Sequence, residues 1–507
     1  MITTTTAPLV LPLDEANQTL LQAVHPPEWQ NPEPRGVYDL VVVGGGTAGL
    51  VSAVGAAGLG ARVALVERAL LGGDCLNVGC VPSKALIRSA RAIAEARRAA
   101  RLGVHIGGVE PDFPAIMRRM RERRAGISAN DSVQRLQRAG VDVFLGSGTF
   151  TGPRTIGVAD HTLMFNRAVV ATGGRPVAPP IPGLSDIPYL TNETVFWLTE
   201  LPQRLIVIGA GPIGCELAQA FARFGSTVTL LGRSPHVLPH EDADAAAIVH
   251  RQLLEDGVRL ELGVKLIEAT RDAGGVGIQY ERRDGTAAGE ATGDHVLVAV
   301  GRAPNVEGLG LDTAGVTVSE AGVVVNDRMQ TSNRRIYAAG DVCSRFKFTH
   351  AADAQARIVI QNALFYGRKR ASALVVPWCT YTDPEVAHVG MYKAEARQKS
   401  HDVKTITITL AEVDRAVLDE EAEGFVRVHH DRGRLLGCTI VAAHAGEMIS
   451  EAAYVVTHGG SLGDLAKTIH PYPTQAEALK KAGDTYRREA LTPSLKRWLD
   501  RYFRWTR

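Results

Sequence analysis

The sequence is poor in cysteine, in aromatic residues and in net charge. Six cysteines occur in 507 residues, aromatic residues make up 6%, and the formal net charge is +2. So few cysteines do not form a disulfide framework in a chain of this length. A near-neutral charge balance gives no electrostatic argument for nucleic-acid binding. These shortages exclude a small disulfide-stapled scaffold, and we expect no nucleic-acid partner.

Long apolar runs are missing as well. No uninterrupted apolar stretch reaches the roughly 18–20 residues of a membrane span. The first six residues lack the basic residues and the apolar core of a secretory signal. We therefore expect a cytoplasmic protein. Because single cores stop growing near ~250–300 residues, the chain should divide into about two to four domains.

Two of the six cysteines lie only five positions apart. Cys75 and Cys80 stand in the segment GGDCLNVGCVPSK, residues 72–84. On an undistorted α-helix their side chains would point roughly 140° apart, whereas a disulfide requires sulfurs ~2.05 Å apart. An irregular turn is therefore expected, and the glycines and the proline of the segment supply suitable backbone. Beside a flavin, such a pair can pass two electrons between ring and sulfur; two buried structural thiols are the alternative.

A dinucleotide-binding fingerprint precedes the thiols. A short apolar run at 39–43 leads into GGGTAG, a small-residue helix is expected to follow, and the next predicted strand ends at Glu67. In this context Gly44 makes the tight turn, Gly46 lets the backbone approach a pyrophosphate, and Gly49 lets the helix lie on the strand. The carboxylate of Glu67 can accept hydrogen bonds from ribose hydroxyls.

A second unit of the same type follows. A predicted strand at 205–208 leads into a turn with the glycines Gly209, Gly211 and Gly214. The repetition predicts two dinucleotide cofactors. At the position equivalent to Glu67 the second copy has Gly232, followed by Arg233. No carboxylate there repels a 2′-phosphate, and Arg233 can bind one. The first unit therefore suits FAD, and the second favours NADPH over NADH.

The pattern GGDC-x4-CVPSK is similar to the redox-active segment of the class I flavin-dependent pyridine nucleotide-disulfide oxidoreductases, a superfamily that includes dihydrolipoamide dehydrogenase, glutathione reductase and mercuric reductase. The likeness covers residues from about 38 to about 490. It implies a homodimer in which the partner completes each active site. It also implies that Cys80 is the thiol nearer the flavin and that Cys75 is the outward-facing, substrate-exchanging thiol. Lys84 and Glu216 match a family ion pair beside the flavin, where a lysine would stabilise developing negative charge.

Further segments match signatures of the same superfamily. ATGGRP resembles the turn that closes the first half of the flavin domain, and GRAPN matches a second signature. IYAAGD resembles the flavin-contacting turn whose aspartate binds the ribityl chain, which suggests that the chain returns to the flavin domain. The resemblance thus implies cofactor contacts from Thr172, Gly173, Arg302 and Asp341.

These observations predict an α/β protein with two doubly wound, Rossmann-like domains, for FAD and NAD(P), and an α+β C-terminal dimerisation domain. The predicted segments are an N-terminal arm at 1–37, the FAD-binding domain at 38–190 and 291–370, the NAD(P)-binding domain at 191–290, the dimerisation domain at 371–490 and a basic aromatic tail at 491–507. Threonines and prolines favour a mobile or loosely docked arm, with one short helix after Asp14 as an option. Five arginines between 118 and 124 are expected on a solvated helix face.

A departure from the family pattern near the C-terminus bears on the substrate. Family disulfide reductases carry His-Pro-Thr-x-x-Glu, whereas this chain has HPYPTQAE at 470–477. Alignment on Pro-Thr-x-x-Glu places Tyr472 at the histidine position, Glu477 at the glutamate position and His470 two residues upstream. A tyrosine with a pKa near ~10 is a poor proton shuttle beside imidazole with a pKa near ~6.5. This departure puts ordinary dithiol–disulfide exchange in doubt.

A tyrosine at this position resembles mercuric reductase, whose substrate is a metal ion. Hg(II) is soft and prefers thiolates, so Cys75 and Cys80 would serve as transient ligands of the substrate. We therefore expect an FAD-dependent NAD(P)H oxidoreductase that reduces Hg(II) or another soft metal ion, although no C-terminal cysteine pair follows Cys438 to deliver the metal. The alternatives are a dihydrolipoamide dehydrogenase or other disulfide reductase with His470 as base, and a flavin-bearing redox sensor. The tail could contact an anionic membrane surface or its own dimer.

Overall fold

The computed structural model describes residues 9–272, 274–285, 287–489 and 491–507. Its chain separates into two compact units. Unit 1 contains the described residues of Met1–Val237 and Leu253–Leu374, and unit 2 contains those of Leu238–Gln252 and Val375–Arg507.

Unit 1 begins with a mixed seven-stranded sheet. In spatial order its strands are β3 (Val141–Leu145), β2 (Val63–Glu67), β1 (Val37–Val43), β6 (His161–Val170), β5 (Thr155–Val158) and β4 (Gly148–Gly152), with β18 (Ile336–Ala338) also paired to β6. The central strands β3, β2, β1 and β6 are parallel, as is β18 with β6. Continuous apolar strands such as β2 suit a sheet that is buried on both faces. Because β18 rejoins this sheet, the predicted return of the chain to the first nucleotide domain is confirmed.

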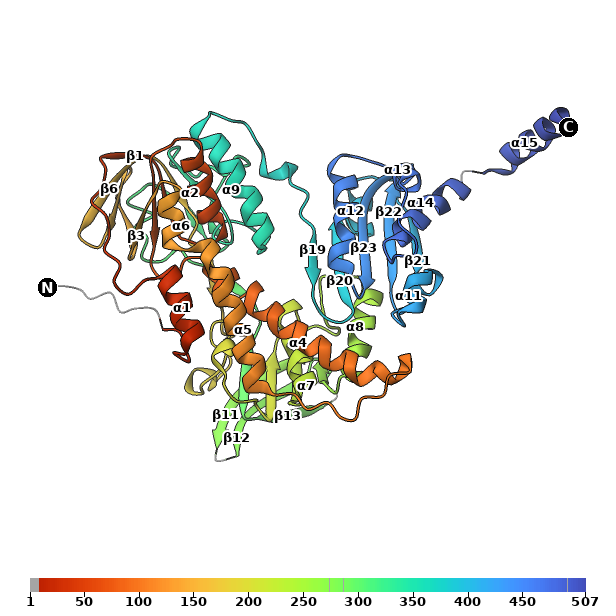
Figure 1. The fold of residues 1–507 in the computed structure, drawn as a ribbon, viewed down its shortest axis with the longest axis horizontal. Helices are drawn as coiled ribbons and strands as arrows, with labels where there is room; N and C mark the ends of the chain where they lie inside the picture. The colour runs from red at the N-terminus through yellow and green to blue at the C-terminus, as the bar shows by residue number, and fades with distance from the viewer. Residues whose placement is uncertain (1–8, 273, 286, 490) are drawn as a thin grey trace. The chain divides into compact units, whose positions relative to one another are not determined.

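Helices α2 (Thr47–Gly58) and α9 (Thr349–Leu364) lie side by side in this domain (Figure 1). Their contact depends on small side chains, because a Cβ at Gly55 would lie 2.6 Å from Cδ1 of Ile360. Helix α2 follows β1 directly, so its N-terminus lies at the carboxyl edge of the sheet, where parallel α/β folds bind ligands. The other helices of unit 1 in the first 240 residues are α1 (Glu15–Val24), α3 (Gly73–Asn77), α4 (Cys80–Arg98), α5 (Phe113–Ser128), α6 (Val133–Arg138) and α7 (Pro212–Phe224).

The second nucleotide domain of unit 1 repeats the strand–glycine turn–helix arrangement. Its parallel sheet has the order β10 (Arg259–Leu262), β9 (Thr227–Gly232), β8 (Arg204–Ile208) and β14 (His295–Val298). An antiparallel sheet of β11 (Val264–Asp272), β12 (Gly275–Arg282) and β13 (Ala288–Gly293) accompanies it, and two strand pairs, β7 (Gly174–Pro176) with β15 (Arg302–Pro304) and β16 (Val318–Ser319) with β17 (Gly322–Val323), complete unit 1. The prediction of two Rossmann-like domains is confirmed.

Unit 2 is an antiparallel sheet covered by helices. The strand order is β19 (Trp378–Thr380), β20 (Glu385–Gly390), β23 (Arg434–Ala442), β22 (Phe425–Asp431) and β21 (Lys404–Thr409). The helices are α8 (Ala243–Glu255), most of which belongs to this unit, α10 (Lys393–Gln398), α11 (Asp414–Leu418), α12 (Ala445–Thr457), α13 (Leu462–Lys467), α14 (Glu477–Glu489) and α15 (Pro493–Thr506). Helices α12 and α14 pack on the sheet. This confirms the predicted α+β class of the C-terminal domain.

The tail predicted at 491–507 forms the helix α15. Thr492 caps it by accepting a hydrogen bond from the N–H of Leu495. None of the residues of α15 is buried. Among the described residues, no helix combines the length and the apolar composition that crossing a bilayer requires.

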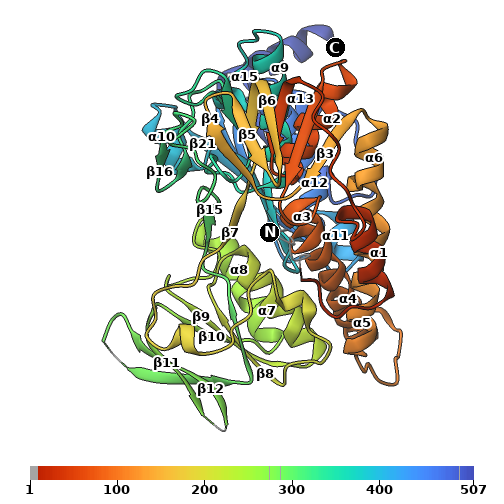
Figure 2. The same cartoon turned by 90° about the vertical axis from the view of Figure 1, so that its left-hand side faces the viewer.

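The N-terminal arm is packed, which corrects the expectation of a mobile or loosely docked tail. Helix α1 begins after Asp14, whose carboxylate caps it as predicted, and its side chains Leu20 and Val24 are fully buried. Helix α1 lies beside α5 (Figure 2). The threonine-rich start, residues 1–8, lies outside the described residues. The prolines of the arm therefore mark an irregular but docked connection to the first strand.

Two of the five arginines that we expected on a solvated face are buried in this contact. Arg121 donates to Asp14 at 2.5 Å, and Arg124 donates to Oδ1 of Asn17 at 2.6 Å. Arg124 also donates to the backbone carbonyl of Asn77 at 2.6 Å, which connects the arm to the cysteine segment. The expectation was wrong for these two because a distant segment supplies the acceptors that let a helix bury cations.

Replacement of Arg124 should destabilise unit 1. Arg124→Met leaves two buried oxygen acceptors without a donor, so we expect the free energy of unfolding to fall by about 2–4 kcal/mol. Urea unfolding of the two proteins measures the difference. Arg123→Met, on the exposed face of the same helix, is the matched control and should change stability by less than about 0.5 kcal/mol. Equal losses in the two variants would contradict the structural role of Arg124.

Candidate functional site

The two thiols lie on either side of a break between two helices. Cys75 lies within α3, and Cys80 is the first residue of α4. Gly79 separates the helices with φ −134° and ψ −112°, and a Cβ there would lie 2.8 Å from the carbonyl oxygen of Asp74. The irregular turn predicted between the cysteines is therefore present, and both cysteines are in the dithiol form.

The environment of the pair gives the two sulfurs opposite acidities. A hydrogen bond from the Cys75 thiol, the hydroxyl of Thr349 and the charge of Lys84 together lower the pKa of Cys80 to about 6. The same hydrogen bond, with burial, raises the pKa of Cys75. Oγ1 of Thr349 lies 3.4 Å from Sγ of Cys80. Because Cys80 begins α4 and Thr349 begins α9, two helix N-termini meet at this sulfur and favour a thiolate.

A charge pair holds Lys84 beside the thiols. Its Nζ lies 2.8 Å from Oε2 of Glu216, whose side chain is buried. Lys84 is on the first turns of α4 and Glu216 is on α7, so the ion pair implied by the family resemblance is formed and connects the two nucleotide domains of unit 1. The carboxylate keeps the ammonium group next to Cys80.

Arg302 connects the cysteine segment to the turn that carries Asp341. Its guanidinium pairs with the carboxylate of Asp74 and lies 3.4 Å from that of Asp341, and it donates to the carbonyl of Gly174 at 2.7 Å. Burial raises the pKa of Asp341, while Arg302 and Lys347 oppose this shift. Sequence reasoning assigned Arg302 to cofactor binding; in the structure its charge is shared by these two carboxylates.

In the first glycine turn, Gly44 and Gly49 lie against backbone atoms, whereas Gly46 has more room around it. Gly44 has φ +109°, and a Cβ there would lie 2.3 Å from the carbonyl oxygen of Ala171. A Cβ at Gly49 would lie 1.8 Å from the carbonyl oxygen of Gly44. The nearest atom to a Cβ at Gly46 is 3.7 Å away, on Gly73. The turn therefore leaves room for a phosphate at the N-terminus of α2, next to the cysteine segment.

Polar groups surround this turn. Both carboxylate oxygens of Glu67 accept backbone N–H groups, from Gly45 and Ala69, and burial raises its pKa. Thr172 donates to the carbonyl of Asn305 at 2.7 Å and thereby fixes the adjacent ATGG turn. A glycine cradle, a carboxylate at the end of β2 and a half-buried carboxylate at Asp341 fit a dinucleotide with ribose and polyol hydroxyls. The residues present therefore fit FAD.

The second glycine turn has the same geometry. Gly209 has φ +116°, a Cβ at Gly214 would lie 1.8 Å from the carbonyl oxygen of Gly209, and a Cβ at Gly211 would meet nothing within 4 Å. At the end of β9, a Cβ on Gly232 would lie 2.6 Å from Cδ2 of Leu262, so this position excludes an acidic side chain. Arg233 is exposed immediately after it.

The C-terminal candidates lie together in unit 2. His470 is bonded at both ring nitrogens, to Oε2 of Glu451 at 2.9 Å and to the carbonyl of Thr468 at 3.1 Å. Tyr472 is 70% exposed and donates to Asp414 at 3.0 Å, which raises the pKa of Tyr472. Glu477 is the first residue of α14. Both ring nitrogens of His470 and the hydroxyl proton of Tyr472 are thus engaged in hydrogen bonds.

Sequence reasoning missed three residues of the cysteine site. Thr349 had no local signal, because it lies 269 positions from Cys80. Asp74 stands within the motif, but its partner Arg302 is 228 positions away. Asn77, which donates to the carbonyls of Leu71 and Gly73, could have been recognised as the polar residue that shapes the loop. No group of three or more His, Cys, Asp or Glu residues in the described part of the chain could hold a resident metal ion.

The site thus has two glycine-lined nucleotide turns, a thiolate–thiol pair and a Lys–Glu pair whose carboxylate is buried. Together they define a two-nucleotide, dithiol oxidoreductase. Residues 38–356 match the family model of the pyridine nucleotide-disulphide oxidoreductases, and residues 376–483 match that of their dimerisation domain. The chain belongs to the pyridine nucleotide-disulphide oxidoreductase family. This family is FAD-dependent and uses NAD(P)H, and the dimerisation domain supports a homodimer. The chain is thus an oxidoreductase.

Individual relatives match over most of the chain. Mercuric reductase of Staphylococcus aureus is 34% identical over 486 residues, which cover 94% of this chain and 88% of that protein. Dihydrolipoyl dehydrogenase of Thermus scotoductus is 35% identical over 468 residues, which cover 90% and 98%. Among solved structures, the HOCl-induced flavoprotein disulfide reductase RclA of Escherichia coli matches with a TM-score of 0.77 and 28% identity, over 88% of this chain and 99% of that one.

The acidity of Cys80 can be measured in the reduced protein. Alkylation by iodoacetamide should follow the Cys80 thiolate and rise as the pH passes through about 6. In Cys75→Ala the donor to that thiolate is lost, so the rise should move toward the ordinary cysteine range near ~8.5. Thr349→Val should shift it in the same direction by less, whereas Thr349→Ser keeps the hydroxyl and is the matched control. An unchanged profile in Cys75→Ala would show that the pair is not coupled.

Proposed function

We propose that this chain is an NADPH-dependent FAD enzyme that reduces Hg(II), or another soft metal ion, at Cys75 and Cys80. In the overall reaction NADPH and Hg(II) give NADP+, a proton and Hg(0), so two electrons leave the nicotinamide and two reach the metal. The relatives include both mercuric reductases and dihydrolipoyl dehydrogenases at similar identity. The choice of substrate therefore depends on the chemistry of the site.

One observation carries the proposal. The position where family disulfide reductases have their acid–base histidine holds Tyr472, whose hydroxyl donates to Asp414. The raised pKa of Tyr472 makes this phenol a still weaker proton shuttle at neutral pH. A disulfide substrate needs a proton for its leaving thiolate, whereas a metal ion needs none. The missing acid–base group is thus compatible with a metal substrate.

The sulfur pair suits a soft cation. The Cys80 thiolate supplies one ligand directly, and Hg(II) binding would replace the proton of the Cys75 thiol and make it the second. The structure holds Cys75 in a dithiol beside Cys80 rather than apart from it, so both sulfurs can bind one ion. Once the Cys75 thiol has released its proton, the two negative sulfurs balance the double positive charge of Hg(II).

The remaining residues position this pair. When bound, FAD supplies two-electron transfer between the reduced nicotinamide and the sulfurs. Gly44, Gly46 and Gly49 would hold its pyrophosphate, Glu67 its ribose, and Asp341 with Thr172 and Gly173 its central part. The nicotinamide nucleotide would bind at the turn of Gly209, Gly211 and Gly214. Lys84, held by Glu216, places positive charge where negative charge develops.

A second candidate function is supported by the contact between His470 and Glu451. An imidazole oriented by a carboxylate is the arrangement that a dihydrolipoamide or other disulfide oxidoreductase requires of its base. Here, however, both ring nitrogens of His470 already face oxygen atoms. A disulfide substrate would have to displace one of these contacts, and we therefore rank this function second.

The metal substrate is tested by release of Hg(0) during NADPH oxidation, with Hg(II) supplied in excess thiol. We expect turnover by the wild type and a loss of about two orders of magnitude or more in Cys75→Ala, because one of the two sulfur ligands is gone. Cys379→Ala, which removes a thiol of unit 2, is the control and should keep activity.

If the wild type released Hg(0) no faster than Cys75→Ala, the proposal that Hg(II) is the substrate would be wrong. In that case Tyr472→His, which restores the family histidine, and His470→Ala, which removes the alternative base, decide between the remaining substrates. High native turnover of lipoamide or glutathione disulfide that His470→Ala abolishes would establish the second function instead.

The preference for NADPH depends on Arg233. Loss of a charge-assisted hydrogen bond to the 2′-phosphate in Arg233→Ala should lower kcat/KM for NADPH by about 10–100-fold and leave that for NADH nearly unchanged. Steady-state kinetics with the two nucleotides measure this. Arg283→Ala, an exposed arginine of the same domain, serves as the control. If the wild type preferred NADH, or if Arg233→Ala lowered kcat/KM equally for both nucleotides, Arg233 would not be the 2′-phosphate ligand.

A further inference from the structure

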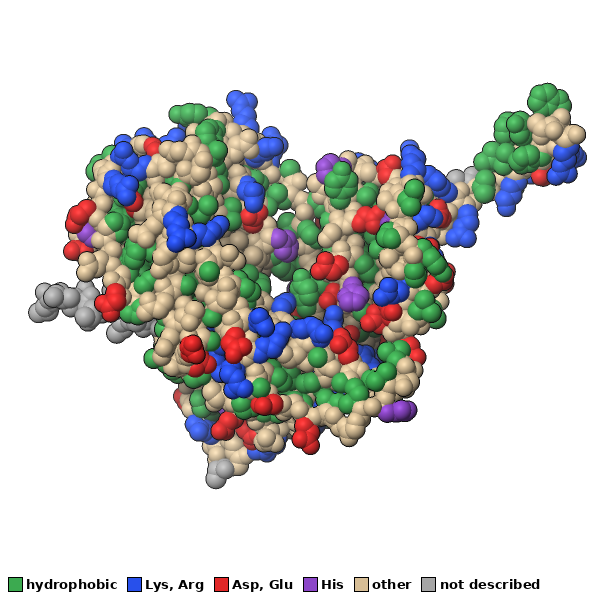
Figure 3. All heavy atoms as spheres, viewed as in Figure 1, with side chains coloured by type: hydrophobic (Ala, Val, Ile, Leu, Met, Phe, Trp, Pro, Cys, Tyr) green, Lys and Arg blue, Asp and Glu red, His purple; other side chains and the backbone are tan. Residues whose placement is uncertain are grey.

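Helix α15 carries its apolar and its basic side chains on opposite faces. With about 100° between successive residues, the apolar side chains fall within an arc of about 160°. They are Leu495, Trp498, Leu499, Tyr502, Phe503 and Trp505. The opposite arc carries the cations Lys496, Arg497, Arg501, Arg504 and Arg507. In the space-filling view the two kinds of side chain occupy different sides of this helix (Figure 3).

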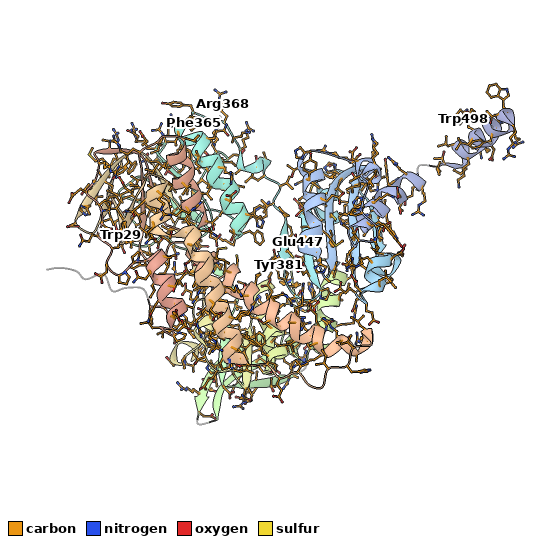
Figure 4. All side chains as sticks on the ribbon, viewed as in Figure 1. Trp29, Phe365, Arg368, Tyr381, Glu447 and Trp498 are labelled. Carbon is orange, nitrogen blue, oxygen red and sulfur yellow. The ribbon has the colours of Figure 1, made fainter. Side chains whose placement is uncertain are left out.

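Nothing in the described chain covers the apolar face. Trp498 is 60% exposed and points away from its helix (Figure 4), and Trp505 is 83% exposed. In the part of the chain that the structure describes, none of the four cations of α15 forms an ion pair, and neither does Arg507. Soluble domains rarely leave several large aromatic side chains exposed together unless the surface binds something.

We propose that α15 binds the surface of an anionic phospholipid bilayer and lies parallel to it. Its aromatic face would enter the boundary between headgroups and acyl chains, where tryptophan and tyrosine are favoured. Its cations would face the anionic headgroups, and each would strengthen binding about fivefold. With 14 residues and one basic face, the helix is too short and too polar to span.

Charge complementarity favours this occupant over a second copy of the chain. The helix and its C-cap residue Arg507 together have five basic residues and one acidic residue, Asp500. A protein groove for it would need a matching excess of acids, whereas the whole chain has a net charge of +2. A bilayer supplies anions all around the apolar contact, on both flanks of the aromatic face.

The test uses the full-length holoenzyme and sedimentation with vesicles. We expect binding to vesicles of phosphatidylcholine with phosphatidylglycerol to be at least about tenfold stronger than to phosphatidylcholine alone, and to weaken with added salt. Arg501→Gln with Arg504→Gln should weaken binding about 25-fold, and Trp498→Ala with Trp505→Ala at least about tenfold. Asp500→Asn is the control with the opposite sign: it removes a negative charge from the basic face and should strengthen binding.

These variants change exposed side chains outside the redox site, so FAD content and NADPH oxidation without vesicles should stay at wild-type values. Equal sedimentation of the wild type with charged and neutral vesicles would overturn the proposal. It would also be overturned if removal of residues 493–507 converted the dimer to monomers in light scattering, since the helix would then belong to the dimer interface.

Discussion

At neutral pH an ordinary cysteine is mainly a protonated thiol, which is a poor ligand for soft metal ions and a poor nucleophile. The chemistry of this protein therefore depends on the stabilisation of a thiolate at Cys80. The Cys75 thiol, the hydroxyl of Thr349, the ammonium group of Lys84 and the first turn of α4 all act on the same sulfur. Glu216 in turn fixes Lys84, so a second domain contributes to the charge at the thiol.

Close backbone contacts determine where that thiolate lies. Gly73, two residues before Cys75, has φ +57°, and a Cβ there would lie 2.6 Å from Cα of Gly46. The cysteine segment is thus in contact with the first glycine turn, and a side chain at Gly73 would separate them. Arg302 adds an electrostatic connection through Asp74 and Asp341. These contacts bring sulfur and dinucleotide site together without any covalent bond between them.

Proton transfer separates the candidate substrates. The C-terminal segment of unit 2 has a tyrosine bonded to Asp414 and a histidine bonded to Glu451 and to the carbonyl of Thr468, so the histidine would have to give up a contact to act as a base. A soft metal ion requires electrons and sulfur ligands, which the thiolate–thiol pair offers.

The sequence by itself determined the two nucleotide folds, the redox cysteines and the α+β domain, because local glycine spacing, strand patterns and a specific motif encode them, and the family resemblance implied the Lys84–Glu216 pair, whose members lie 132 positions apart. The tertiary structure decided what depends on distant contacts. The packed arm, the burial of Arg121 and Arg124, and the contact of Thr349 with Cys80 join residues 107 to 269 positions apart. No local pattern specifies such pairs, because burial of a cation or placement of a hydroxyl depends on which segment the fold brings against it.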